Sequence, residues 1–164
     1  MFVSCPTALS EPQEQSRSLV LRELELFGLE PRALGRTDYP VDTPLKEVLV
    51  VARHCAGGVI LGFSQTVTRE AVGKPGTGEE ADMSGVQLPT PWNHLEAGIL
   101  YAIGLPLLIF RERGIAGGIF DIGTTETFIH PMPTPAVAVD PTSGLHDVFL
   151  KWQSRVQQRY YQQD

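Results

Sequence analysis

Short runs of apolar residues constrain what this chain can fold into more than any other feature of its sequence. The clearest are Val59–Phe63, Leu107–Phe110 and Ala136–Val139, and each is bounded by Gly, Pro or a polar residue. Runs this short that end at turn-forming residues are typical of buried strands, since a helix needs about ten residues or more. Because the runs show no apolar–polar alternation, we expect helices to cover both faces of the sheet, as in parallel α/β proteins.

Helix signals alternate with these strands. Ser10 and Gln13 have the spacing of a capping box, and Thr43-Pro44 and Thr90-Pro91 each place an N-cap residue before a proline at the first helical position. The predicted helices run from Ser10 to Gly28, from Thr43 to about Gly57, from Thr90 to Gly104 and from Leu145 to Tyr161. Two further strands are predicted at Met1–Cys5 and Arg32–Leu34.

The order of these elements predicts an α/β fold. Right-handed crossovers between short apolar strands favour a flavodoxin-like three-layer sandwich with a five-stranded, mostly parallel sheet in the order 2-1-3-4-5. With 164 residues, the chain is expected to form a single domain over residues 1–164. A long loop at about residues 64–89 interrupts the alternation and is interpreted as a functional flap, a mobile insertion or a misread element.

Charge and cysteine content exclude several classes of function. The chain has 13 Lys and Arg residues against 19 Asp and Glu residues, a net charge of −6, which argues against a polynucleotide partner because such proteins need a basic face. No apolar run approaches the roughly 20 residues that span a bilayer, so no membrane partner is expected. Two isolated cysteines, Cys5 and Cys55, fit neither a disulfide framework nor a zinc site. We therefore expect a cytoplasmic protein without a metal or cofactor.

The fold class also predicts where a ligand binds. In a doubly wound sheet the crevice lies at the carboxyl ends of the strands, near the switch between strands 1 and 3. The candidate binding residues at these ends are Ser4, Cys5, Pro6 and Thr7 after strand 1, Arg36 after strand 2, Phe63, Ser64 and Gln65 after strand 3, and Arg111 after strand 4. Cys5 is interpreted as a small buried residue in preference to a reactive thiol.

The helix that begins at Thr90 carries the strongest candidate for chemistry. Asn93 and Glu96 are three residues apart and therefore share a face, and the residues around Glu96 are apolar. A lone acid in such surroundings is costly unless it is used or paired, and the nearby helix N-terminus favours its ionised form. The alternative is a structural role, in which Glu96 pairs with Arg36 or Arg111 or lies at the surface.

The segment Asn93–Pro106 (NHLEAGILYAIGLP) resembles the signature helix of nucleoside 2-deoxyribosyltransferases. The opening strand into Ser4-Cys5-Pro6 is similar in position to the opening strand and Gly-Pro loop of that family. TIR-like domains share the same three-layer arrangement, and some of them cleave the glycosidic bond of NAD with a helix glutamate. The resemblance extends over the order of elements to about Phe110, and its specific motif covers only the helix.

The resemblance implies roles for individual residues. Glu96 would attack or electrostatically shield the anomeric carbon as the base leaves an N-glycoside. Asn93 would bind sugar hydroxyls, Trp92 would stack on the base, and Arg36 would bind a phosphate or carboxylate. Ser4, Thr7, Ser64 and Gln65 would make polar contacts to the base or ribose. The resemblance also implies a homo-oligomer.

Two readings of the function follow. The first is an enzyme that cleaves or exchanges the N-glycosidic bond of a nucleoside, a nucleotide or an NAD-like molecule through Glu96. Because Gly62–Gln65 stands where the deoxyribosyltransferases have an acidic loop, the substrate stays open among these three. The second is a non-catalytic nucleotide-binding or sensing module that uses the same crevice. A scaffold protein with a vestigial crevice is a third, simpler alternative.

Overall fold

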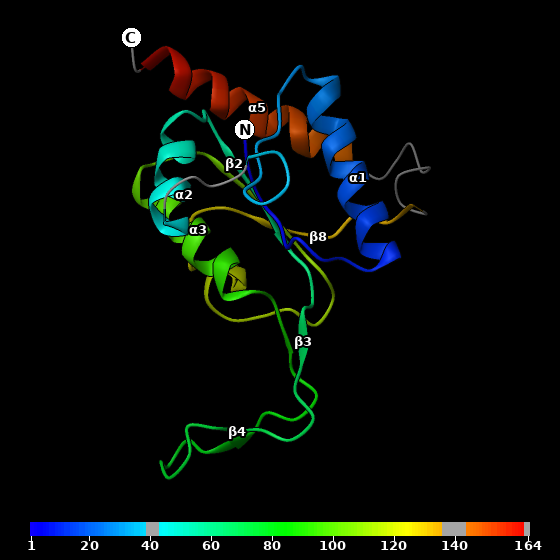
Figure 1. The fold of residues 1–164 in the computed structure, drawn as a ribbon, viewed down its shortest axis with the longest axis vertical. Helices are drawn as coiled ribbons and strands as arrows, with labels where there is room; N and C mark the ends of the chain where they lie inside the picture. The colour runs from blue at the N-terminus through cyan, green and yellow to red at the C-terminus, as the bar shows by residue number, and fades with distance from the viewer. Residues whose placement is uncertain (39–42, 136–143, 163–164) are drawn as a thin grey trace.

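The computed structural model describes residues 1–38, 43–135 and 144–162 and has a parallel sheet at its centre (Figure 1). The four strands of this sheet are β1 (Phe2–Ser4), β2 (Gly58–Gly62), β7 (Leu107–Arg111) and β8 (Ile129–Pro131), hydrogen-bonded in the order β1-β2-β7-β8. Every neighbouring pair is parallel. The prediction of an α/β fold with a parallel sheet is therefore confirmed.

Helices cover both faces of the sheet, as the apolar strands required. On one face lie α1 (Glu11–Leu26) and α5 (Leu145–Gln162), and on the other lie α2 (Pro44–Arg53) and α3 (Pro91–Ala102) (Figure 1). Successive side chains of a strand point to opposite faces, so Val59 and Leu61 pack in the cluster beneath α1 and α5 while Ile60 packs beneath α2 and α3. The result is a three-layer α/β/α arrangement.

The helix starts confirm the local signals in the sequence. Ser10 forms the predicted capping box with Gln13, and α2 and α3 begin at Pro44 and Pro91, directly after their N-cap threonines. Among the described residues, no helix combines the length and the apolar character that crossing a bilayer requires.

The described part of the sheet has four strands, so the prediction of five is not borne out. The expected second strand is reduced to one parallel bridge between Phe2 and Arg32. The chain turns immediately afterwards, because the carbonyl of Ala33 accepts hydrogen bonds from the amides of Arg36, Thr37 and Asp38. The strand expected at Ala136–Val139 lies outside the described residues, and β8 falls in a Gly-, Thr- and Pro-rich region that showed no strand pattern.

The segment 64–89 is a two-stranded arm rather than a structureless loop. Near the body β3 (Thr66–Val67) pairs with β6 (Gln87–Leu88), and further out β4 (Val72–Gly73) pairs with β5 (Ala81–Asp82), both antiparallel. Figure 1 shows the arm extending away from the sheet and its helices. Most of its side chains are exposed.

Candidate functional site

A cavity of about 310 Å³ opens at the carboxyl end of β1. Its walls come from the segment after β1, the turn at Leu34 and Gly35, the start of α2 and the first turns of α3. Its lining includes the predicted residues Cys5, Pro6, Thr7, Trp92, Asn93 and Glu96, together with Leu34, Gly35, Pro44, Val48 and Thr90. The cavity thus lies at the end of strand 1, but no residue of β2, the strand expected to share the crevice with it, lines it.

Glu96 is the acid of this cavity. Only 9% of the residue is exposed, and burial raises the pKa of its carboxyl to about 7, against the lowering effect of a hydrogen bond from Ser4. The helix N-terminus was expected to favour the ionised form, but the loss of hydration outweighs it. No cation of the described chain pairs with Glu96, so the proposed salt bridge to Arg36 or Arg111 is wrong. The carboxyl can therefore hold or release a proton near neutral pH.

Asn93 is buried and its side chain points to protein partners. Its Nδ2 donates to Ser4 Oγ at 2.9 Å and to the carbonyl of Leu61 at 3.4 Å, while its Oδ1 accepts from the hydroxyl of Thr90 at 3.0 Å. Only 1% of Asn93 and none of Ser4 is exposed. These partners occupy both ends of the carboxamide, so its hydrogen bonds do not support the expected contact with sugar hydroxyls.

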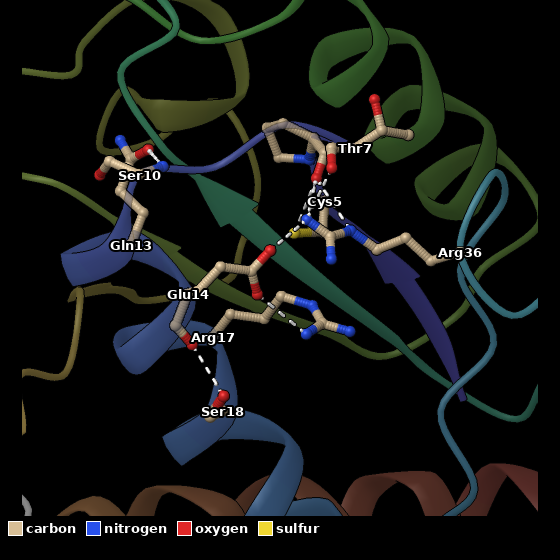
Figure 2. A network of polar contacts seen from close by, with 9 residues as sticks. Cys5, Thr7, Ser10, Gln13, Glu14, Arg17, Ser18 and Arg36 are labelled. Atoms are coloured by element: carbon tan, nitrogen blue, oxygen red, sulfur yellow. Dashed lines mark hydrogen bonds and ion pairs between the residues drawn. The ribbon is translucent and has the colours of Figure 1, made fainter.

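Arg36 lies behind the cavity wall in a network of polar contacts (Figure 2). Its guanidinium donates to the carbonyls of Pro6 and Thr7, at 2.9 to 3.0 Å, and to Glu14 Oε1 at 2.7 Å. Burial alone would raise the pKa of Glu14, but the hydrogen bonds and charges of Arg36 and Arg17 lower it overall. The guanidinium is thus engaged in holding the segment after β1 against α1, and it does not line the cavity.

Cys5 faces the cavity as a protonated thiol. Burial raises its pKa to about 11, against the lowering charges of Arg36 and Arg17. The Sγ atom donates weakly to the carbonyl of Pro6 at 3.5 Å. At neutral pH the thiol is therefore neutral and a poor nucleophile, in line with its interpretation as a small buried residue.

Phe63, Ser64, Gln65 and Arg111 lie away from this cavity. Phe63 is fully buried beneath α1 and α5, the amide of Ser64 donates to Glu112, and Gln65 is exposed at the base of the arm. Arg111 lines a separate cavity of about 780 Å³, whose lining includes Pro12 and Ser16 of α1. These four residues were grouped with the site because all follow a strand.

The ring of Phe120 explains why the cavity does not extend over the end of β2. Phe120 ends the short 3-10 helix η1 (Gly118–Phe120) and packs on Gly62, where the ring leaves no room for a Cβ. The Nη1 of Arg111 donates to the carbonyls of Ile115 and Phe120 at 3.2 and 2.6 Å and so holds this segment in place. The ring of Phe120 therefore occupies the space beside Gly62 at the end of β2.

Gly35 was expected at the crevice because it follows strand 2, but sequence reasoning missed Leu34, Pro44 and Val48, which form the opposite wall of the cavity with it. Gly35 has a φ of +75°, and a Cβ there would lie 2.9 Å from the methyl group of Thr7. A glycine just before Arg36 was a usable signal for such a close turn. Pro44 and Val48 carried no signal beyond helix formation.

Within the described chain, no three His, Cys, Asp or Glu side chains gather as a metal site would require. No family model matches the chain, and no curated protein or solved structure shows significant similarity to it.

Proposed function

We propose that this protein cleaves or exchanges the N-glycosidic bond of a nucleoside-type substrate, with Glu96 as the catalytic carboxyl. The observation that carries the proposal is a buried carboxyl with a pKa of about 7 at the wall of a mostly apolar cavity. A strongly shifted acid in a cleft is more common at functional sites than elsewhere. The half-exposed indole of Trp92 lines the same cavity and offers a flat surface for a base.

The proposed reaction needs little besides the carboxylate. As the bond between the anomeric carbon and the base nitrogen breaks, its electron pair leaves with the base, which takes a proton from solvent. The carboxylate of Glu96 bonds to the anomeric carbon or stabilises its positive charge. Water or a second base then attacks that carbon, and the carboxylate is released unchanged. The poor hydration that raises the pKa of Glu96 also strengthens its attraction to the developing cation.

The charges around the cavity favour an uncharged nucleoside over a nucleotide or an NAD-like molecule. All Lys and Arg residues of the chain fall within the described ranges, and none lines the cavity. Arg36, the expected phosphate ligand, is held by Glu14 and two backbone carbonyls. A phosphate would therefore enter without a cation to compensate for its lost hydration.

Release of free base from nucleosides tests the proposal. We expect Glu96→Gln to lower the rate at least about 100-fold, because an amide cannot take the role of the carboxylate. Glu25→Gln, which changes an exposed glutamate on α1, is the matched control and should leave the rate unchanged. Each nucleoside is assayed beside its 5′-monophosphate, and we expect the nucleoside to react faster. Equal rates for the wild type and Glu96→Gln on a confirmed substrate would remove Glu96 from the mechanism.

The arm favours a second candidate, a non-catalytic nucleotide-binding or sensing module that signals to a partner. Exposed apolar side chains on the arm include Val67, Val72 and Met83, which a binding partner would cover. This candidate requires nucleoside or nucleotide binding, measured by calorimetry, together with no base release at high protein concentration. Turnover under those conditions would exclude it.

We further propose that the protein forms a homo-oligomer in the cytoplasm. We also propose that its sheet has the flavodoxin-like strand order 2-1-3-4-5. Exposed apolar groups on the arm support self-association, and two unpaired cysteines suit a reducing compartment. The Arg32 bridge beside β1 supports position 2 of the order 2-1-3-4-5, with β8 in the fifth position. Light scattering of the purified chain tests the oligomer, and a monomer at all concentrations would exclude it.

A further inference from the structure

A second and larger cavity lies where β7 ends. Its volume is about 780 Å³, against about 310 Å³ for the cavity at the end of β1, and no described residue lines both. Pro12 and Ser16 of α1, Arg111 at the end of β7, and Ile129 and Pro131 of β8 belong to its lining. Ligands of parallel α/β sheets bind outside the carboxyl ends of the strands, and the size of this cavity suits a small organic molecule.

Two arginines in the wall of this cavity have no acidic partner among the described residues. Arg111 donates through Nη1 to the carbonyls of Ile115 and Phe120, and its Nε and Nη2 form no hydrogen bond with any described residue. Arg113 is exposed in the turn that follows β7. Unpaired guanidinium groups at a cavity favour an anionic ligand, because they supply charge-assisted hydrogen bonds to it.

The acid of the lining, Glu112, is occupied by other donors. Its Oε2 accepts from the amide of Ser64 at 2.6 Å and from Gln13 Nε2 at 3.0 Å. These hydrogen bonds offset its negative charge, and two arginines face one carboxylate in the lining. The described lining therefore carries more positive than negative charge, unlike the cavity of Glu96, which no Lys or Arg residue lines.

Ser16 adds a buried hydroxyl that lacks a partner. The residue lines the cavity and is only 6% exposed. Ser18 donates to the carbonyl of Glu14, as helical serines often do, but the hydroxyl of Ser16 forms no hydrogen bond with a described residue. Leaving a buried polar group unpaired costs free energy. An oxygen atom of a ligand in the cavity would supply the missing partner.

We propose that this cavity binds an organic phosphate, with Arg111 and Arg113 holding the phosphate group and the hydroxyl of Ser16 donating to the ligand. The planar guanidinium matches the geometry of a phosphate, with two parallel N–H groups for two oxygens. Ile129 and Met132 offer an apolar surface to the rest of the molecule. The site is separate from Glu96 and does not depend on the reaction proposed above.

NMR titration of ¹⁵N-labelled protein measures both the affinity and the place of binding. The probes are phenyl phosphate, adenosine 5′-monophosphate, inorganic phosphate and benzoate. We expect the two phosphate esters to shift the amide signals of Gly114 and Ala116, which line the cavity. They should bind at least about tenfold more tightly than inorganic phosphate, which has no apolar part to bury. Benzoate should also bind more weakly, because a carboxylate has fewer acceptor oxygens and less charge.

Variants of the lining test the roles of individual side chains. Arg113→Gln should raise the Kd of phenyl phosphate about tenfold, and Ser16→Ala about threefold. Arg22→Gln, at an exposed position of α1 outside the lining, removes the same charge and should leave the Kd unchanged. Arg111 is kept, because its hydrogen bonds also hold the segment after β7.

Three results would overturn the proposal. The first is equal affinity of Arg113→Gln and the wild type for phenyl phosphate, with the other amide signals showing that the variant is folded. The second is inorganic phosphate or benzoate binding as tightly as phenyl phosphate. The third is the absence of any shift at Gly114 and Ala116 with both phosphate esters.

Discussion

Glu96 lowers the stability of the fold at the pH where the proposed reaction needs its carboxylate. Its carboxyl ionises near pH 4.5 in an unfolded chain but near 7 in the folded protein. The folded state thus holds a proton that the unfolded state has lost, and stability falls as the pH rises from about 4.5 to 7. An acid whose pKa is shifted this strongly by burial in a cleft is more common at functional sites than elsewhere.

The first prediction concerns this dependence on pH. Glu96→Gln should match the wild type in stability below pH 4.5 and exceed it by about 3 kcal/mol at pH 8, where only the wild type must bury a charge. Urea denaturation at pH 4.5 and pH 8 measures the difference. A wild type whose stability does not decline between these values relative to Glu96→Gln would show that Glu96 is hydrated in solution.

The second prediction concerns Arg36. Lysine keeps the charge but cannot bond at once to two carbonyls and a carboxylate, so Arg36→Lys should lower the free energy of unfolding by about 1–2 kcal/mol. Arg22→Lys, an exposed position on α1, is the control and should change it by less than about 0.5 kcal/mol. Equal stability of the two variants would mean that the network in Figure 2 contributes little in water.

At the residue scale, sequence reasoning located the residues of the cavity better than it identified their hydrogen-bond and ion-pair partners. Glu96, Trp92 and the segment Cys5–Thr7 could be placed in one cavity because they follow from a strand end and a helix start, both of which are local features. The pairing of Arg36 with Glu14 could not, since it joins a turn to a helix earlier in the chain. The inward orientation of Asn93 also depends on β1 and β2 lying beside α3.

At the scale of elements, the arm contacts the body at its base, where Gln87 forms a parallel bridge with Ile115, while its outer part lies outside the two buried clusters. The amide of Gln65 donates to the carbonyl of Leu88 at 2.9 Å, which closes the arm where it leaves the body. Neither of the two hydrophobic clusters that cover the faces of the sheet includes a residue between Gln65 and Leu88. A two-stranded ribbon on its own is only marginally stable in water. The arm therefore contributes little to the stability of the body.

The third prediction follows from this separation. Replacing residues 69–85 by Asn-Gly, the usual two-residue hairpin turn, should leave a folded protein whose Tm lies within about 5 °C of the wild type. Thermal unfolding followed by circular dichroism measures this. Light scattering on the same sample shows whether self-association is lost. Collapse of the fold would mean that the arm covers part of the body in solution.

Helices were easier to predict than strands for a physical reason. A helix start is encoded within four residues, as in the capping box of Ser10 and Gln13 or the Thr-Pro pairs before α2 and α3. A strand is defined by its neighbours, so β8 formed at Ile129–Pro131 because β7 lies beside it. The strands of the arm are each only two residues long and carry too little pattern to detect.

At the scale of the whole molecule, the two tryptophans lie in different environments, one packed against the sheet and one at the cavity. Trp152 of α5 is 4% exposed, and its Nε1 donates to the carbonyl of Pro106 at 3.0 Å, which ties α5 to the sheet. Trp92 is 43% exposed at the cavity. The two tryptophans therefore report on different events, the first on packing and the second on the site.

The fourth prediction uses this division. In Trp152→Phe the fluorescence arises from Trp92 alone, and a nucleoside that stacks on the indole should quench it in a saturable way. The variant should also lose about 1 kcal/mol of stability, because the carbonyl of Pro106 loses one of its two hydrogen bonds and keeps the one from the amide of Gly58. Titration with uncharged nucleosides measures the quenching. No quenching by a nucleoside that calorimetry shows to bind would place the base away from Trp92.

The neutral thiol of Cys5 gives the cavity a practical use. Because burial raises the pKa of the thiol to about 11, Cys5 should react slowly with general alkylating reagents. A small molecule seated beside Glu96 would instead hold an attached electrophile against the sulfur, where proximity replaces acidity as the source of rate. A mass-spectrometric screen of disulfide or acrylamide fragments would then identify the fragments that bind in the cavity and react with Cys5. The wild-type protein thus contains a covalent probe for its own ligands.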